Sequence, residues 1–81
     1  MREEIMQLKY RAAEAKKKIK GVDLEAKGLV LVIRTRIDPF EPIGKLKTEE
    51  ALASMQRLHE LAEERRELER ELGEYEDALD V

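Results

Sequence analysis

The sequence contains no cysteine and no tryptophan, and its only aromatic residues are Tyr10, Phe40 and Tyr75. The absence of cysteine excludes disulfide bridges and thiolate metal sites. No apolar run approaches the roughly 18 residues needed to span a bilayer. The first ten residues are charged and periodic, unlike a signal peptide. We therefore expect a cytoplasmic protein without a membrane segment and without a cofactor.

Length and composition favour association with other chains. The 81 residues provide for one small domain, spanning residues 1–81. A chain of this size buries only about 60% of the surface that it exposes when unfolded. Many of its apolar residues are alanines, each of which buries little area. We expect a homo-oligomer, either a dimer or a tetramer, or a subunit of a larger protein complex.

Charge is divided unevenly along the chain. Residues 1–44 hold ten Lys and Arg against seven Asp and Glu, whereas residues 45–81 hold six against twelve. A basic half and an acidic half indicate either two different partners or attraction of the two halves for each other.

The first part of the chain has the apolar spacing of a coiled-coil helix. Apolar residues recur at alternating intervals of four and three: Met1, Ile5, Leu8, Ala12, Ala15, Ile19 and Val22. This heptad seam predicts a helix over residues 2–20. Gly21 weakens its end, because glycine in a helix costs about 1 kcal/mol relative to alanine.

The next stretch, GLVLVIRTRIDPFEP, is β-branched and apolar and then alternating. It predicts a strand over residues 29–37 that is followed by a proline-containing connection over residues 38–47. A single strand has two unpaired edges, so we expect it to pair with the same strand of a second subunit. The predicted oligomer interface consists of Leu29, Val30, Leu31, Val32, Ile33, Ile37 and Phe40.

A long second helix is predicted over residues 48–78, with Thr48 as its cap and Glu49 and Glu50 at the positive end of its dipole. Its later part again has a seam with alternating intervals: Leu61, Arg65, Leu68, Leu72, Tyr75 and Leu79.

The flanking charges of the two seams predict antiparallel pairing. The predicted ion pairs are Lys9–Glu76, Lys16–Glu69, Arg11–Glu71 and Lys18–Glu64. In one register Ala15 lies opposite Arg65, and a shift of one heptad satisfies the same charges. The pairing is formed either within one chain or between two. The predicted fold is therefore mainly α: helix–strand–helix, an antiparallel coiled-coil-like helical hairpin with one short β-strand that pairs between subunits.

Residues able to carry chemistry are few. His59 is the single histidine, and the sequence HELAE lacks the second histidine of a zinc-binding HExxH helix. We interpret His59 as a partly buried packing residue. No serine or threonine is accompanied by a base, so we predict no catalytic residue and no metal site. Arg65 occupies a seam position, where a long polar side chain either extends to Glu64 or Glu69 or fixes the register.

A basic cluster gives an alternative function. The possible anion or nucleic-acid contacts are Lys16, Lys17, Lys18, Lys20, Arg34 and Arg36. No aromatic residue accompanies them for base stacking, and the whole chain is acidic.

The leading hypothesis is a non-enzymatic scaffold or adaptor subunit that homo-oligomerises through its strand and its helix seams. Two alternatives remain at this point. One is a nucleic-acid-associated protein that uses the basic cluster. The other is a small helical enzyme with an inter-subunit site around His59, Arg65 and Arg34.

Overall fold

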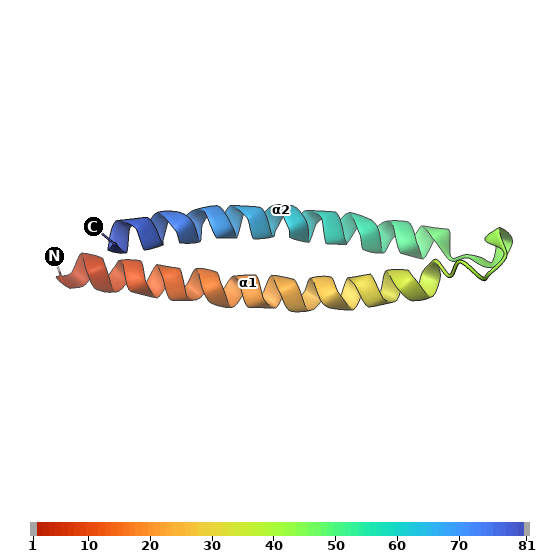
Figure 1. Ribbon diagram of the computed structural model, residues 1–81, viewed down its shortest axis with the longest axis horizontal. Helices are drawn as coiled ribbons and strands as arrows, with labels where there is room; N and C mark the ends of the chain where they lie inside the picture. The colour runs from red at the N-terminus through yellow and green to blue at the C-terminus, as the bar shows by residue number, and fades with distance from the viewer. Residues whose placement is uncertain (1, 81) are drawn as a thin grey trace.

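The chain folds as one extended helical hairpin (Figure 1). The computed structural model describes residues 2–80, and Met1, the first residue of the predicted seam, lies outside them. Helix α1 (Arg2–Arg36) and helix α2 (Thr48–Leu79) run antiparallel, and their connection contains one 3₁₀ turn, η1 (Ile43–Lys45). The hairpin measures 63 × 16 × 14 Å. We call the end with the connection the tip, and the end with both termini the open end.

The helical hairpin and the long second helix are confirmed. Helix α2 begins at Thr48, as predicted, and ends at Leu79, one residue later than predicted. Glu49 and Glu50 lie in its first turn, where carboxylates face the positive end of the helix dipole. The cap is different, because Lys47 occupies the N-cap position without a side-chain hydrogen bond.

The predicted strand over residues 29–37 is wrong. Residues 29–36 continue α1, which reaches Arg36 instead of ending at residue 20, and no strand is found anywhere in residues 2–80. Gly21 and Gly28 lie inside this helix and have no positive φ angle. The prediction that this segment pairs as a strand between subunits is therefore not supported.

The heptad seam explains why the apolar stretch is helical. Beyond Val22, the same intervals of four and three continue through Ala26, Leu29, Ile33 and Arg36, all of which are partly buried. Leu29 packs against the buried cluster between the helices. A helix pairs its own backbone groups, whereas a lone strand leaves both edges unpaired.

Local propensity is too weak to oppose this arrangement. Each β-branched residue costs up to about 0.7 kcal/mol in a helix relative to alanine, so Val30, Val32, Ile33 and Thr35 together cost about 2–3 kcal/mol. Burying one leucine or isoleucine side chain contributes about 1.5–3 kcal/mol. Thr35 is accommodated by a hydrogen bond from its Oγ1 to the carbonyl oxygen of Val32 at 2.7 Å.

The core between the helices is thin. Its buried apolar residues are Ala12, Ala15, Val22, Ala51, Leu61 and Leu68. Three of these six are alanines, and Leu61 is the largest fully buried side chain, at 1% exposure. Val22, Leu61 and Leu68 form one cluster near the middle of the hairpin. A core of this size provides little apolar burial for a chain of two long helices.

Of the two registers predicted for the helix pair, the structure has the one shifted by seven residues from the register that places Ala15 opposite Arg65. Arg65 pairs with Asp23, which is next to Val22, and not with the residues around Ala15. The four predicted lysine or arginine pairs with glutamate are absent from the ion pairs of residues 2–80. The predicted direction of the helices is thus right, but other charges join them.

Candidate interaction surface

Four apolar side chains near the tip are exposed, and together we call them the tip face: Val30, Ile37, Leu52 and Met55. They are between 40% and 70% exposed. Ile37 directly follows α1, and its amide still donates to the Ile33 carbonyl at 2.9 Å, so Val30 and Ile37, seven residues apart, lie on the same side of this helical path. Ile37, Leu52 and Met55 line one shallow hollow of about 240 Å³ together with Thr48 and Ala51. The tip face thus draws its residues from both helices.

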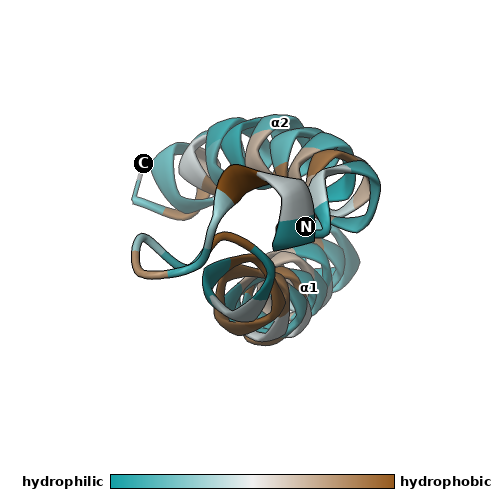
Figure 2. Cartoon of the chain, turned by 90° about the vertical axis from the view of Figure 1, so that its right-hand side faces the viewer, coloured by the Kyte–Doolittle hydropathy of each residue, from teal (hydrophilic) through white to brown (hydrophobic). Residues whose placement is uncertain are grey.

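Apolar residues continue around the tip end of α1. Figure 2, which looks at the molecule from the tip, shows the nearest turns of this helix largely in the hydrophobic colour. Leu24 and Leu31 lie seven residues apart on its outer side, and both are exposed. Val32 is exposed as well. Large exposed apolar surfaces of this kind mark interaction sites in soluble proteins.

The connection at the tip holds two more apolar side chains in solvent. Phe40 is 93% exposed and Ile43 is 84% exposed. The backbone around them is fixed, because the Phe40 amide donates to Asp38 Oδ1 at 2.9 Å and the Lys45 amide donates to the Pro42 carbonyl at 2.9 Å. The connection therefore presents Phe40 and Ile43 outward from an ordered turn.

Ion pairs join the helices on the side opposite the tip face. Arg57 donates from Nε to Glu25 Oε2 at 2.7 Å and from Nη2 to Glu25 Oε1 at 3.2 Å. This hydrogen-bonded guanidinium lowers the pKa of the Glu25 carboxyl. Nearer the tip, Arg36 Nε lies 2.6 Å from Glu50 Oε2 without the alignment of a hydrogen bond. This side is charged, in contrast to the tip face.

A third ion pair lies in the middle of the hairpin. Arg65 contacts Asp23 of α1 and Glu69 of its own helix. Its hydrogen bonds to Asp23 lower the pKa of that carboxyl and raise the pKa of the guanidinium. Arg65 thus extends to Glu69, which is the first of its two predicted roles, and it contacts Asp23 of α1 in addition.

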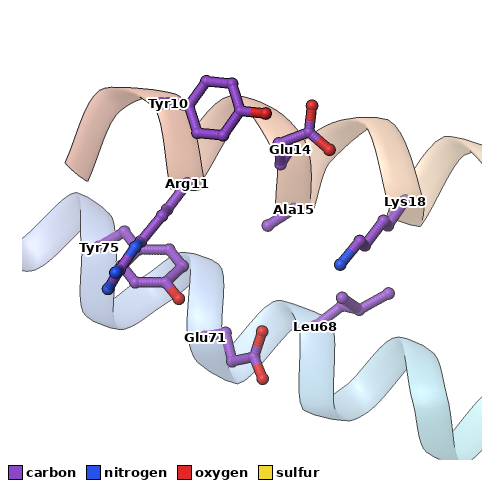
Figure 3. Close-up of a pocket in the computed structure, with 8 residues that line it drawn as sticks. All are labelled: Tyr10, Arg11, Glu14, Ala15, Lys18, Leu68, Glu71 and Tyr75. Carbon is purple, nitrogen blue, oxygen red and sulfur yellow. The ribbon is translucent and has the colours of Figure 1, made fainter. Parts of the chain in front are cut away.

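A second hollow, of about 300 Å³, lies near the open end (Figure 3). It is lined by Tyr10, Arg11, Glu14, Ala15, Lys18, Leu68, Glu71 and Tyr75. Arg11 and Lys18 extend from α1 toward α2, and Glu71 and Tyr75 lie beside the ribbon of α2. The hollow contains no nucleophile with an adjacent base, and its charges are of both signs. Its chemistry is that of a solvated groove between paired helices.

The seven residues predicted to form the oligomer interface divide into two groups. Leu29 and Ile33 are partly buried along the seam within the chain. The others are exposed: Val30, Leu31, Val32, Ile37 and Phe40. Of the exposed five, Val30 and Ile37 belong to the tip face, so part of the predicted set is brought together on a helical surface.

The basic residues do not form a single patch. Lys16, Lys17, Lys18 and Lys20 are exposed on the open half of α1. Arg34 and Arg36 lie at least fourteen residues further along the same helix, which corresponds to about 21 Å at 1.5 Å per residue. Arg36 is already engaged by Glu50. Nucleic-acid binding stays a prediction.

The residues of the enzyme alternative have separate partners. His59 Nε2 lies 3.0 Å from Glu63 Oε1 on the same helix, and its side chain is exposed, contrary to the packing role predicted for it. Arg65 contacts Asp23 and Glu69. No group of three potential ligands that could hold a metal ion occurs among the described residues. Neither helix, across the same part of the chain, has an apolar stretch long enough to cross a bilayer.

The sequence contained a signal for the tip face that the strand prediction hid. Ile37 and Val30 continue the seven-residue series Lys9, Lys16 and Asp23 along α1. Continuing the heptads past Gly28 would have placed these residues on one helical side. Leu52 and Met55, at an interval of three, already indicated an apolar side of α2 next to its seam.

Comparison with family models, with curated proteins and with solved structures finds no match for this chain.

Proposed function

We propose that this chain is a non-enzymatic interaction subunit that self-associates through the exposed apolar sides of its helices. One observation carries the proposal. The hairpin buries six apolar residues, three of them alanines, whereas twelve large apolar side chains are exposed on residues 2–80. Large exposed apolar side chains thus outnumber the fully buried ones two to one, which is unusual for a small domain that is stable on its own.

The energetics of the tip face support association. Covering a valine, leucine, isoleucine or methionine side chain contributes about 1.5–3 kcal/mol when burial is complete. The four residues of the tip face are about half exposed, so a partner would add several kcal/mol in total. That amount is comparable with the whole stability of many small domains.

The charges of the two helices favour a second copy of this chain over an unrelated apolar partner. Helix α1 has ten Lys and Arg against five Asp and Glu, and helix α2 has four against eleven. Contacts between helices of the same kind repel, while α1 attracts the α2 of another copy. A second copy is thus complementary in charge as well as in hydrophobicity.

Sedimentation equilibrium and light scattering test the proposal on the full chain. We expect an oligomer at micromolar concentration that dissociates on dilution. Leu52→Gln should shift dissociation to a concentration at least tenfold higher, since it places an amide in an apolar contact at a cost above about 1.4 kcal/mol. Ala53→Gln is the control, because Ala53 is exposed on the same helix and belongs to none of the apolar surfaces described above. A folded monomer at all accessible concentrations would overturn the proposal.

A further inference from the structure

We infer that the tip face is covered by a second copy of this chain in parallel orientation, with a two-fold axis along the hairpin. In this arrangement the two tips lie at the same end, and α1 of each copy lies against α2 of the other. The product is a four-helix bundle. The inference rests on the proposed self-association and specifies its geometry.

The tip face continues along the whole hairpin as a surface made of two rows with a spacing of seven residues. The row on α1, from tip to open end, is Ile37, Val30, Asp23, Lys16 and Lys9. The row on α2, in the same direction, is Thr48, Met55, Ala62, Glu69 and Glu76. Both rows are uncharged and mainly apolar at the tip. Toward the open end, one row becomes basic and the other acidic.

Symmetry then selects the orientation. When two copies stack face to face, a two-fold axis along the hairpin places α1 opposite the partner's α2 at the same height. Apolar tip residues meet apolar tip residues, and Lys16 and Lys9 meet Glu69 and Glu76 of the partner. A two-fold axis across the hairpin instead places α1 against α1, with apolar residues facing lysines. Of the two arrangements, only the parallel one places apolar residues together at the tip and opposite charges together near the open end, with Asp23 opposite Ala62 between them.

The charges needed for this contact are not consumed within the chain. Lys9, Lys16 and Glu76 form no ion pair with any other residue in the range 2–80. Glu69 contacts only Arg65 of its own helix. The complementary charges first expected within the hairpin are therefore left for a contact between copies.

The size of the surface is adequate for a stable dimer. The two larger dimensions of the hairpin are 63 and 16 Å, which bound the covered area at about 1,000 Å² on each copy. Specific protein interfaces cover about 800 Å² on each partner. The opposite side of the hairpin faces solvent in this dimer. It is polar and holds the ion pairs Glu25–Arg57 and Arg36–Glu50.

Electron spin–spin distance measurements on the intact dimer test the orientation. Because the chain has no cysteine, Asp77→Cys provides one unique labelling site, exposed near the open end of α2. In the parallel dimer the two labels lie within about 40 Å, since neighbouring helices in a bundle are 8–10 Å apart. In an antiparallel dimer the labels lie beyond about 50 Å, the length of α2 at 1.5 Å per residue. A distance in the longer range overturns the inference.

A charge exchange tests which residues meet. The Lys9→Glu, Lys16→Glu variant and the Glu69→Lys, Glu76→Lys variant should each dimerise at least tenfold more weakly than the original chain, because like charges then face each other. Mixed in equal amounts, they should form a heterodimer, in which both contacts are again between opposite charges. If mixing restores nothing, these four residues do not meet between copies and the inference fails.

These experiments distinguish self-association from the parallel orientation of the two copies. A chain that is monomeric by sedimentation defeats the proposed self-association. A dimer with long label distances, or without heterodimer formation, leaves self-association standing and defeats the parallel arrangement. A dimer with short distances and selective heterodimer formation supports both.

Discussion

Arg65 of α2 binds Asp23 of α1 through two hydrogen bonds, from Nε to Oδ1 at 2.6 Å and from Nη2 to Oδ2 at 3.2 Å. Such a two-point contact between a guanidinium and a carboxylate is directional. It occurs at a seam position between the buried residues Leu61 and Leu68. A shift of the helices by one heptad would separate the two groups, so the pair specifies the register that the apolar residues alone leave open.

Acid should weaken the hairpin through this pair and the Glu25–Arg57 pair. The hydrogen bonds to arginine lower the pKa of Asp23 and of Glu25 in the folded chain. Their contribution to stability is therefore present above the unfolded values of about 3.9 and 4.3, and it is lost as the pH falls through the lowered folded values. We expect the melting temperature, followed by circular dichroism, to decrease below about pH 4.

The double variant Asp23→Asn, Glu25→Gln should show a smaller decrease over the same pH range. Asp77→Asn, which removes an exposed carboxylate without an ion pair in the described chain, should follow the original protein. Equal pH slopes for the double variant and the original chain would show that the two ion pairs do not contribute to folding stability.

Leu61 and Leu52 should respond differently to the same substitution. Leu61 is 1% exposed, and Leu61→Ala should cost about 2–5 kcal/mol and lower the melting temperature at every protein concentration. Leu52 is 70% exposed in the single chain. Leu52→Ala should lower the melting temperature only where the chain is associated, because its effect is coupled to oligomerisation. A Leu52→Ala effect that persists on dilution would contradict its place on the tip face.

The helical hairpin was predictable because its signal is long and regular. The seam of α2 and the first half of the α1 seam recur at intervals of four and three over several heptads, and tertiary packing maintains that period. The stretch from Leu29 to Ile37 was misread because β-branched residues give a local preference that is real but weak. The interaction that outweighs this preference is tertiary: Leu29 and Ile33 are partly buried, and Leu29 packs against the cluster of Val22, Leu61 and Leu68.

The candidate surface was predictable only in part, for a related reason. Length and composition led to the expectation of a partner, and Val30 and Ile37 were predicted at an interface as part of a strand that the structure does not contain within residues 2–80. Leu52 and Met55 were not among the predicted interface residues, because an apolar side of a helix has the same sequence pattern whether it is covered by its own chain or by another. Exposure in the folded hairpin makes the distinction.

Replacing helical glycines by alanine should stabilise the hairpin. A Cβ atom at Gly21, Gly28 or Gly73 would meet no atom within 4 Å, and none of these residues has a positive φ angle. Each substitution should therefore add about 0.5–1 kcal/mol to the free energy of unfolding, measured in urea. Ala13→Gly, at an exposed position of α1, should have the opposite effect. Destabilisation by Gly28→Ala would indicate that this part of the chain is not helical.

The apolar residues of the tip connection should be dispensable for folding. Phe40 and Ile43 are 93% and 84% exposed, so Phe40→Ser with Ile43→Ser should change the free energy of unfolding by less than about 0.5 kcal/mol. Asp38→Ala is the contrasting variant in the same connection, because it removes the acceptor of the Phe40 amide and should cost about 0.5–1.5 kcal/mol. Urea unfolding of both variants at equal concentration makes the comparison. A loss of more than about 1 kcal/mol in the serine variant would mean that these side chains are covered in the assembled protein.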